Sequence, residues 1–453
     1  MASNLCVASV SLVAAFAAAI APAAVIHVPA DAGTIAAAVA LARDGDVIEL
    51  EPGVYAGKGN RDVDIATSNL TIRGAAGAGS TVIDCGGTID DQHRAFNVHV
   101  TGITLQGITI RHGFVIGNGA GALIEPDSDR RGYGPLVVSG CVFDSCVAMI
   151  GEWPADSGGA LTIRALSVAT IDQCSFVCNA SDGSAAGLVC GEVGGLALTR
   201  SLFACNVNVG SDSTAGCSLA IDGWLTVDRC EFSHNSGAAW IAAFYPVISN
   251  CLIHDNAGAL PGGFFGGNYL ILRHTTFANN IAANGSYSEQ IQSWNGYVED
   301  SIIWDDDAYI SHTEVFGCCL KLTSFAGTYG NTDVDPMFVD PDSENYRLQP
   351  SSPLVDYGSY LHAGSDPFDF DGNPRSVDIP DIPNGSYAPE DTGCYELQLS
   401  APTADLDENG TVDAADLAIL VGAWGPCASC AADLTGDGVV DGADLAELLA
   451  AWG

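Results

Sequence analysis

A short pattern of apolar and polar positions recurs along the middle of the chain. In each copy an apolar residue, often Phe, stands two positions after a small residue or Cys and three positions before an Asn. Clear copies end at Asn179, Asn206, Asn235, Asn256 and Asn280. Looser copies lie earlier, at Ile110 and at Cys141 with Phe143, and later, at Ile303 with Asp306.

The spacing of these copies predicts a stack of short parallel strands. Seven intervals separate Ile110 from Ile303 and cover 193 residues, or about 28 residues each. That length suits one turn of a parallel β-helix, in which each coil stacks its strands on those of the coil before. Because side chains two positions apart share one face of a strand, Cys174 and Phe176, like Cys230 and Phe232, are expected to point inward.

The Asn residues of the pattern are expected to form a ladder at a bend between strands. Asn tolerates left-handed backbone and can hydrogen-bond its equivalent in the next coil. Sugar binding by such a column is the alternative, and the structural ladder is the interpretation we favour. The same alignment places Asp306 at the ladder position of the last coil, so that residues 305–307 are interpreted as a turn rather than as paired acids of a glycoside hydrolase.

The segment before the first copy predicts a cap over the open end of the stack. Residues 34–43 are Ala-rich, with Thr34 or Asp31 able to cap the start of a short helix and Gly45 able to end it. Residues 47–50 are then predicted to be the first strand, and residues 52–55 a turn into the second.

The stretch from Ile26 to about Ser311 resembles the right-handed parallel β-helix proteins of the pectin-lyase-like fold. The likeness rests on the phrases IHVPADAGTIAAAV, GDVIELEPGVY and LTIRG together with the Asn column. It implies an all-β, right-handed parallel β-helix solenoid over residues 25–330, with an N-terminal capping helix. Lyases, hydrolases and non-catalytic adhesins share this fold, so the resemblance assigns no activity.

The next segment, residues 331–397, resembles the C-terminal part of exported bacterial β-helix proteins that carry varied surface anchors. The matching phrases are DPMFVDP, YRL, DGNPR and DTGCYE. The resemblance implies a C-terminal cap that closes the last coils. A short polar linker, residues 398–404, is expected to follow it.

The chain ends with two segments that repeat at a spacing of 28 and share 13 of 21 aligned residues. Their oxygen-bearing residues stand at the ligand positions of EF-hand loops, which suits Ca²⁺. The first loop offers Asp405, Asp407, Asn409, the carbonyl of Thr411, Asp413 and Asp416. The second offers Asp433, Thr435, Asp437, the carbonyl of Val439, Asp441 and Asp444. Since Thr435 replaces a carboxylate, the second site is expected to be weaker.

This tandem arrangement resembles the type I dockerin, in which each loop precedes one helix and the pair binds a cohesin. Residues 405–453 are therefore expected to form a small α-helical, dockerin-like module with a cohesin-like or cell-surface partner. At loop positions 10 and 11, where cohesin-recognising dockerins carry polar residues, this chain has Ala414, Ala415, Gly442 and Ala443. That departure puts a cohesin partner in doubt and leaves the calcium ligands in place.

Each loop is followed by an apolar helical pattern. Leu417, Leu420 and Trp424, like Leu445, Leu448 and Trp452, are expected on packed helix faces, so both tryptophans are assigned to the core rather than to a sugar platform. Between the repeats, Cys427 and Cys430 are interpreted as a small disulfide, in preference to half of a zinc site or a redox pair.

Composition and the N-terminus bear on partners and location. With 55 acidic against 15 basic residues the formal charge is -40, which repels nucleic acid and anionic membrane surfaces, and polyuronates unless calcium bridges the carboxylates. Residues 1–24 resemble an export signal, with an apolar run from Val7 to Ile20 before an A-x-A pattern, although no Lys or Arg precedes the run. No later segment is long and apolar enough to predict a transmembrane span. We expect a secreted or cell-surface protein whose fifteen remaining cysteines leave at least one thiol free.

Candidate catalytic residues come from aligning the coils. The alignment places Gln173, Arg200, Arg229, Asn250, His274 and Asp300 in one outward column, with His234, Asp255, Asn279 and Asp305 beside it. A calcium-dependent lyase needs acids that hold Ca²⁺ against a uronate and a nearby base. On that basis the candidates are Arg200, Arg229, His254, Asp255 and His274. An ordinary solvated face is the simpler interpretation of the same residues.

The leading functional hypothesis is a β-helix protein for surface or carbohydrate interaction, attached through the calcium module. The alternative is a polysaccharide lyase or glycoside hydrolase. Five aromatic residues are candidates to stack on sugar rings, namely Trp153, Trp224, Trp294, Tyr297 and Trp304.

Overall fold

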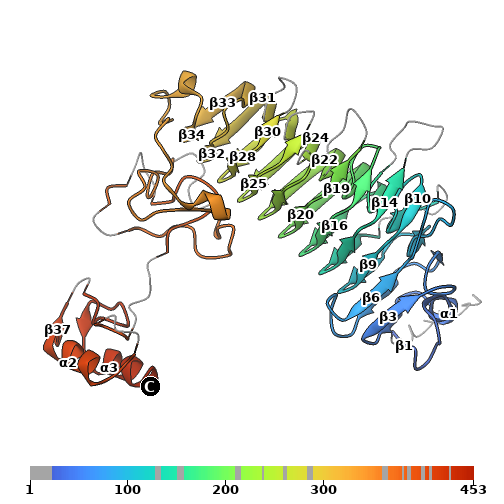
Figure 1. Ribbon diagram of the computed structural model, residues 1–453, viewed down its shortest axis with the longest axis horizontal. Helices are drawn as coiled ribbons and strands as arrows, with labels where there is room; N and C mark the ends of the chain where they lie inside the picture. Colours follow the sequence, from blue (N-terminus) through green and yellow to red (C-terminus); the bar gives the residue numbers. More distant parts are fainter. Residues whose placement is uncertain are drawn as a thin grey trace, which may run out of the picture.

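The protein is an elongated stack of coils followed by a smaller C-terminal part (Figure 1). The computed structural model describes residues 23–127, 134–149, 158–209, 216–236, 239–258, 263–282, 289–359, 366–379, 382–384, 389–398, 404–407, 411–427 and 430–452. The expected export signal, Trp153 and Asn409 therefore lie outside the described residues, as does most of the expected linker.

The largest element of the stack is a parallel sheet, here called the long sheet, to which most coils contribute two strand segments in two adjacent ladders. In β19, β22, β24, β31 and β33 the two segments join in one strand of up to 12 residues, which runs through the bend between the ladders. Its strands are β1 (Val25–Val28), β2 (Val47–Leu50), β4 (Val63–Ile65), β5 (Thr71–Gly74), β7 (Phe96–Val98), β8 (Thr104–Gln106), β11 (Ala122–Ile124), β12 (Leu136–Ser139), β15 (Leu161–Leu166), β16 (Ala169–Asp172), β19 (Leu188–Thr199), β22 (Cys217–Asp228), β24 (Ala239–Ser249), β27 (Gly263–Asn268), β28 (Ile271–Arg273), β31 (Glu289–Glu299) and β33 (Tyr309–Phe316).

A second parallel sheet, here called the second sheet, closes another side of the coils. Its strands are β3 (Gly53–Ala56), β6 (Thr81–Asp84), β9 (Thr109–Arg111), β13 (Val142–Asp144), β17 (Ser175–Val177), β20 (Leu202–Ala204), β23 (Glu231–Ser233), β25 (Leu252–His254), β29 (Thr276–Ala278), β32 (Ile302–Ile303) and β34 (Cys319–Leu320). Two short parallel sheets form a third side, made of β10 (Phe114–Ile116), β14 (Val147–Met149), β18 (Ala180–Ser181) and β21 (Val207–Asn208), and of β26 (Ala257–Gly258) and β30 (Ile281–Ala282). The predicted fold, a right-handed parallel β-helix, is confirmed.

The interior of the stack is a column of apolar side chains in register. Phe143, Phe176, Phe203 and Phe232 are direct partners on successive strands of the second sheet, and their rings stack with centroids 4.7 to 5.1 Å apart. The cysteines two positions before them, where present, are buried free thiols. The predicted inward ladder is therefore confirmed, and these cysteines act as small apolar groups.

The Asn ladder is also confirmed, with a correction to its backbone. Each side-chain amide donates to the next Asn oxygen at 2.9 to 3.0 Å. The left-handed residue is the one before each Asn, for example Cys178 with φ 53°. The ladder ends at Asp305, whose carboxylate accepts from the backbone and side chain of Asn280. The prediction of Asp306 at this position is wrong, because the last coil lacks the left-handed residue and is one residue shorter.

The N-terminal cap forms as predicted, with shifted details. Helix α1 (Ile35–Leu41) starts at Thr34, whose hydroxyl accepts from the amide of Ala37 at 3.2 Å. Its C-cap is Ala42 rather than Gly45. Strand β1 precedes the helix and pairs in parallel with β2, so residues 47–50 form the second strand of the long sheet and not the first strand of the chain.

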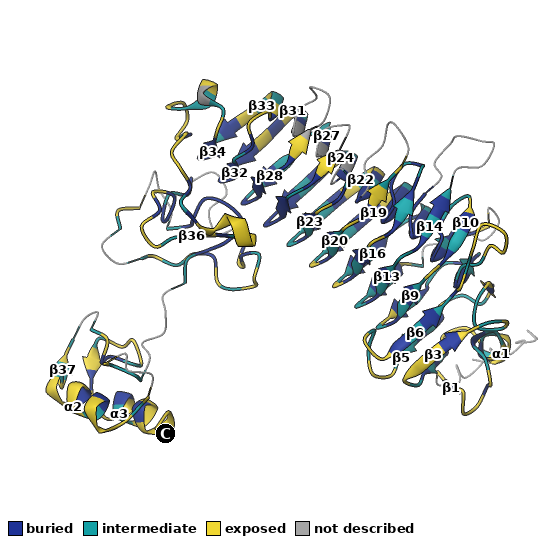
Figure 2. Cartoon of the chain, in the orientation of Figure 1, coloured by how far each residue is buried: buried dark blue, intermediate teal, exposed yellow. Residues whose placement is uncertain are grey.

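The segment after the coils folds back along the side of the stack; residues 335–397 are here called the covering segment (Figure 1). It contains β35 (Phe338–Asp340), η2 (Pro341–Ser343) and β36 (Asn345–Leu348), after η1 (Thr323–Phe325) at the end of the coils. It buries its apolar residues against outward-facing side chains of four strands, Leu252, Ala278, Ile302 and Cys319. The expected closing cap therefore covers the outer face of the second sheet (Figure 2).

The last residues form a small separate core. Helices α2 (Ala414–Gly422) and α3 (Gly442–Ala450) pack through Leu420 and Leu448, and β37 (Gly425–Pro426) pairs with β38 (Val439–Val440). The predicted disulfide between Cys427 and Cys430 is present. The prediction that both tryptophans are in the core is wrong, since Trp424 is 52% and Trp452 44% exposed. Among the described residues, no helix is long and apolar enough to cross a membrane.

Candidate functional site

The predicted polar column lies at the turn between the long sheet and the second sheet. Its six members all have left-handed backbone, with φ between 45° and 53°, and they are Gln173, Arg200, Arg229, Asn250, His274 and Asp300. Left-handed backbone turns the chain sharply from one strand into the next, so the same position recurs in each coil. The sequence alignment of the coils is thus correct here, but the environment of the residues changes along the column.

The two arginines of the column are held by acids at the ends of long-sheet strands. Arg200 Nε donates to Asp172 at 2.9 Å, and Arg229 Nε donates to Asp228 at 2.8 Å. The guanidinium of Arg229 also lies 5.8 Å from the ring centroid of Phe368, in the covering segment. Both cations are therefore already paired within the protein and brace the turns.

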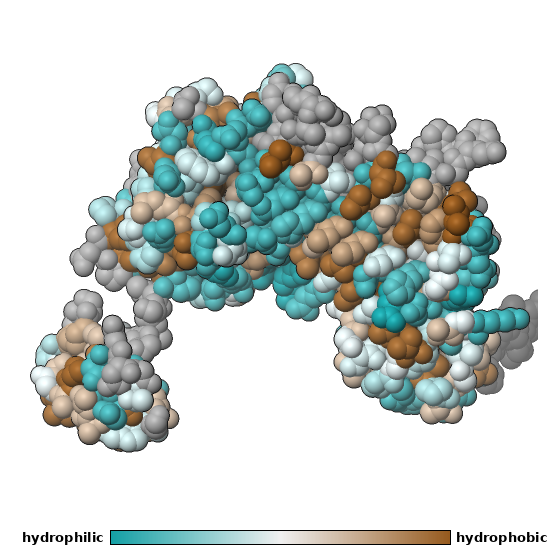
Figure 3. Space-filling view, viewed as in Figure 1, coloured by the Kyte–Doolittle hydropathy of each residue, from teal (hydrophilic) through white to brown (hydrophobic). Residues whose placement is uncertain are grey.

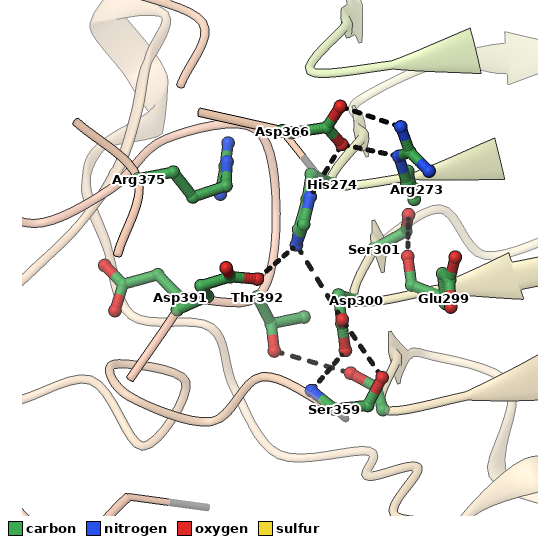
Figure 4. Close-up of polar contacts among 12 residues, drawn as sticks. Arg273, His274, Glu299, Asp300, Ser301, Ser359, Asp366, Arg375, Asp391 and Thr392 are labelled. Atoms are coloured by element: carbon green, nitrogen blue, oxygen red, sulfur yellow. Dashed lines mark hydrogen bonds and ion pairs between the residues drawn. The ribbon is translucent and has the colours of Figure 1, made fainter. Parts of the chain in front are cut away.

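His274, further along the same column, is not on an outward face. Its side chain is 2% exposed, because the covering segment brings Asp366 to 3.3 Å from Nδ1 and Glu390 to 3.5 Å from Nε2 (Figure 4). Burial and the charge of Arg375 act to lower the pKa of His274, but the carboxylates around it outweigh them and the pKa is raised. The carboxylates therefore favour the charged form of His274, whose contacts join the covering segment to the coils.

Neighbouring acids complete this buried cluster. Asp366 also accepts two hydrogen bonds from Arg273, at 2.5 and 2.8 Å. Burial acts to raise the pKa of Asp366, but His274 and Arg273 lower it to about 2. Asp300 lies 3.7 Å from His274 and accepts from the amide and hydroxyl of Ser359. Burial raises its pKa to about 6.

Arg375 occupies the centre of the covering segment and is fully buried. Its guanidinium donates to the carbonyls of Gly393 and Cys394 at 3.2 and 2.8 Å and lies 3.7 Å from the Glu396 carboxylate. Burial and the charge of Asp391 raise the pKa of Glu396 to about 9, and burial raises the pKa of Asp391 to about 6. Arg375 thus lies beside the Glu396 carboxyl, and Figure 4 shows Arg375 in the same buried cluster as Asp391 and His274.

The other two candidates, His254 and Asp255, lie at the opposite end of the second-sheet strands. The His254 ring is 2% exposed and contacts Asp255 at 2.8 Å and Glu231 at 3.3 Å. Tyr346 of the covering segment donates to Asp255 at 2.8 Å. Burial acts against charging His254, but the two carboxylates raise its pKa. The five predicted catalytic residues are therefore divided between two edges, and only Asp255 borders an open groove.

That groove runs between the coil turns and the covering segment, with a volume of about 930 Å³. Its wall residues include Asp255, Trp304, Lys321 and Tyr346 and the acids Asp305, Asp306, Asp307, Asp335, Asp342 and Glu344. Lys321 pairs with Asp306 at 2.7 Å and lies 5.9 Å from the Trp304 ring centroid. Because carboxylates dominate, the groove disfavours anionic ligands.

Aromatic side chains gather at the bend of the long sheet. Those exposed there are Trp224 (46%), Phe244 (53%), Tyr245 (54%), Tyr269 (47%) and Trp294 (60%). Trp224 is the direct partner of Tyr245 on the next strand, and the rings of Tyr245 and Tyr269 stack at 5.2 Å. Tyr297, also proposed from sequence, is 37% exposed and packs on Phe316, with ring centroids 6.2 Å apart. Figure 3 shows one face of the molecule, on which separate hydrophobic patches lie in a largely hydrophilic or neutral surface.

The carboxylates of the first C-terminal loop converge. Oxygens of Asp405, Asp407 and Asp416 all lie within 4.8 Å of one another. Asp416 accepts from the amides of Leu406 and Asp413 at 2.6 and 2.8 Å, which closes the loop onto α2. Such a set of hard oxygens suits Ca²⁺. The residues present therefore fit the predicted ion.

The second loop closes in the same way. Asp444 accepts from the amides of Thr435 and Asp441 at 2.8 Å, and Asp433 accepts from the amide of Gly438 at 2.8 Å. The Thr435 hydroxyl donates to Asp444 at 3.0 Å, where the first loop has the carboxylate of Asp407. Both loops offer four carboxylates, because Asp437 of the second loop stands where the first has Asn409. The weaker second site expected from Thr435 stays a prediction.

In comparison with known proteins, the chain is similar to several solved structures. No protein-family model matches the chain, and no curated protein matches it. Among solved structures, the chain is similar to pectate lyase Pel9A with a TM-score of 0.47 and 13% identity, over 83% of this chain and 96% of that one. It is similar to the PL6 family alginate lyase AlyGC with a TM-score of 0.32 and 13% identity, over 66% and 51%. Pectin methylesterase PemA from Erwinia chrysanthemi gives 0.26 and 14%, over 65% and 80%. At these TM-scores and identities the similarities carry no argument about the chemistry of this chain.

Sequence reasoning missed the partners of the buried histidines. Asp366 and Glu390 stand about a hundred positions after His274, which they contact, in a segment without the coil pattern that also contains the buried Arg375. The DGNPR phrase contains Arg375, and this was the one signal that marked it. No periodicity connects it to the coils that it covers.

Proposed function

We propose that this protein is an exported β-helix protein that binds carbohydrate on the outer face of its coils and attaches through a calcium-dependent C-terminal module. The observation that carries the proposal is the group of exposed aromatic side chains at the bend of the long sheet. Aromatic rings are usually buried because of their large apolar area. Five exposed rings on neighbouring strands of a rigid scaffold therefore indicate a binding surface.

The candidate catalytic column favours binding over catalysis. A general base must reach its substrate, but His254 and His274 are each 2% exposed beneath the covering segment. Arg200 and Arg229 are paired with strand-end acids. Arg200 therefore braces a turn of the coils, and Arg229, His254 and His274 contact the covering segment as well.

The test is a panel of purified polysaccharides incubated with the full-length protein, with and without Ca²⁺. Binding is measured by affinity electrophoresis, and products by reducing-end assay and absorbance of unsaturated sugars. We expect retention on at least one polysaccharide without product formation. Reproducible new reducing ends or unsaturated products would contradict the non-catalytic part of the proposal.

A polysaccharide lyase or glycoside hydrolase remains the second candidate function, and the acidic groove favours it. The groove combines an ionisable pair, Asp255 with His254, and the aromatic ring of Trp304 in an open volume of about 930 Å³. Hydrogen bonds from His254 and Tyr346 offset burial and lower the pKa of Asp255, so the group is a carboxylate at neutral pH. If activity is found, Asp255→Asn should abolish it and Arg200→Gln should leave it unchanged.

The C-terminal module is proposed to need Ca²⁺ for its fold. Its core consists of four fully buried apolar residues, Leu420, Ala432, Val440 and Leu448, which is small for an independent unit. Three converging carboxylates repel one another until a cation binds. Bound Ca²⁺ would be held by the loop ligands and would supply this missing stabilisation.

Calorimetry of the full chain tests this. In excess Ca²⁺ we expect a transition for the module that disappears on chelation, while the transition of the coil stack is unchanged. Asp405→Ala should remove the Ca²⁺ dependence more completely than Thr435→Ala. A thermogram that is identical with and without chelator would refute the calcium assignment. Attachment to a cohesin-like or cell-surface partner is proposed as the role of the folded module.

A further inference from the structure

A distinct groove lies within the aromatic surface of the long sheet. Its volume is about 490 Å³, and four successive coils contribute to it through β22, β24, β27 and β31. The lining residues are Ile221, Asp222, Ala242, Ala243, Phe244, Gly267, Asn268, Gln292 and Trp294. It is separate from the acidic groove and shares no residue with it.

The sides of this groove are aromatic and its polar groups are available. Phe244 is 53% and Trp294 60% exposed. Asp222, Asn268 and Gln292 also line it, and within the described residues none of their side chains forms a hydrogen bond. Amide and carboxylate groups of this kind donate to and accept from sugar hydroxyls. Apolar ring faces with a few polar groups between them are typical of sites for small polar ligands.

The floor of the groove is kept flat by small residues. Gly267 has φ 149°, and a Cβ added there would lie 2.1 Å from the carbonyl oxygen of Ala243. No larger residue is therefore tolerated without moving the backbone. With Ala242 and Ala243 beside it, the floor admits a flat ring that lies against the sheet.

Charge decides which carbohydrate fits. Among the described residues that line the groove there is no Lys, Arg or His, and the one charged residue is Asp222. The nearby ring of His312 lies 4.7 Å from that of Trp294, centroid to centroid. The whole chain carries a formal charge of -40. A polyuronate would meet repulsion from Asp222 and from this net charge, with no cation among the described lining residues to offset it.

We infer that this groove binds an uncharged polysaccharide, with a sugar ring stacked on Trp294 or Phe244 and its hydroxyls bonded to Asp222, Asn268 and Gln292. The inference rests on the proposed carbohydrate-binding function and names its ligand class and site. The strands that form the groove belong to successive coils, so a linear glycan would lie along the axis of the stack.

The test compares binding of neutral and uronate polysaccharides by full-length wild type and variants. Trp294→Ala should raise the Kd for the neutral glycan about tenfold, as loss of a stacked aromatic anchor does. The double variant Asn268→Ala with Gln292→Ala should weaken binding without removing an aromatic ring. Trp452→Ala removes an exposed tryptophan, 44% against 60% for Trp294, from the C-terminal module and should leave the Kd unchanged.

Two outcomes separate this inference from the proposed function. If a neutral glycan binds and neither groove variant weakens it, the site assignment is overturned and carbohydrate binding stands. Preference for a polyuronate likewise overturns the ligand class alone. If no polysaccharide binds the wild type, both the inference and the proposed function are overturned. Unchanged thermal unfolding of each variant confirms that the stack is folded.

Discussion

The interior edge of the coil stack and the underside of the covering segment both contain buried polar groups, but the groups differ in charge. The stack buries a row of neutral amides, in which each Asn from Asn179 to Asn280 bonds to the next. The covering segment buries ionisable groups, with His274 and Arg375 among a larger number of carboxyl groups (Figure 4).

The difference has an energetic consequence. A neutral amide that makes its hydrogen bonds costs little to bury, because none of its groups loses a large charge hydration. A buried ion pair loses that hydration and depends on every partner being in place. We therefore expect the stack to be insensitive to solution conditions and the docking of the covering segment to be conditional.

Removal of Arg375 should have the largest effect on this contrast. Arg375→Met keeps most of the volume but leaves the carboxyl of Glu396 and two buried carbonyls without their cationic donor. Leaving the two buried carbonyls unpaired costs about 1–3 kcal/mol each, and loss of the cation removes the partner of the surrounding carboxyl groups. Hydrogen exchange should become fast in the described parts of residues 366–397 and stay slow in β17, β20 and β23.

The matched control is Arg347→Met, since the Arg347 side chain is 47% exposed and pairs with Asp371 on the surface. It should change exchange only slightly, because exposed pairs contribute little. Equal protection of the covering segment in Arg375→Met and wild type would show that the buried charges are not what holds it.

Rising pH should loosen the covering segment more gradually. In the folded state, burial raises the pKa of Asp300 and Asp391 to about 6 and that of Glu396 to about 9. The ordinary values are 3.8 for Asp and 4.5 for Glu. The folded state then binds more protons than the unfolded state, so stability falls as pH rises from about 4 through these values. His274, whose pKa is also raised, loses its contribution in the same direction.

Asp366 acts in the opposite sense at low pH. Its pKa in the folded state is about 2, below the ordinary Asp value of 3.8. Its contribution to stability is therefore present above pH 3.8 and is lost toward pH 2. Docking should be firmest near pH 4 to 5. Exchange rates corrected for intrinsic pH dependence, measured for residues 366–397 and for β20 from pH 4 to 9, check this; parallel profiles would contradict it.

The smallest effect is expected from one rung of the neutral ladder. Asn235→Ala removes the acceptor for the amide of Asn206 and the donor to the carbonyl of Phe203, both buried. Leaving such groups unpaired costs about 1–3 kcal/mol, spread over neighbouring coils. Urea unfolding of the stack gives the change, with Asn97→Ala, on the exposed side, as control. A cost above that of Arg375→Met would reverse the contrast.

The coil stack could be predicted from sequence because each coil has the same types of residue at the same positions, facing equivalent neighbours. Phe203 and Asn206 face the same neighbours as Phe232 and Asn235, so spacing alone reveals them. Asp305 was misassigned by one position because the repeat itself loses a residue there. The covering segment has no repeat, and its contacts, such as His274 with Asp366, join positions 92 apart.

The candidate sites, too, could be predicted from sequence only where their residues lie close together along the chain. The proposed calcium ligands could be named from sequence because each short loop contains its whole set, and the structure brings Asp405, Asp407 and Asp416 of the first loop together. Calcium binding itself stays a prediction. The groove around Phe244, Asn268 and Trp294 collects single residues from separate coils. The sequence named Trp294 as a candidate for stacking but did not indicate the residues that lie beside it. Exposure of Trp294 could be learned only from the packed sheet.

The Asn ladder also has a direction. Every side-chain amide donates toward the C-terminal end of the stack, so the aligned dipoles present their positive end to Asp305. A carboxylate satisfies that end and, having no proton to give, cannot pass the chain of donors on. Asp305 therefore ends the ladder and limits the number of coils that it spans. Exchanging it for Asn would restore a donor and free the ladder to be extended by an added coil.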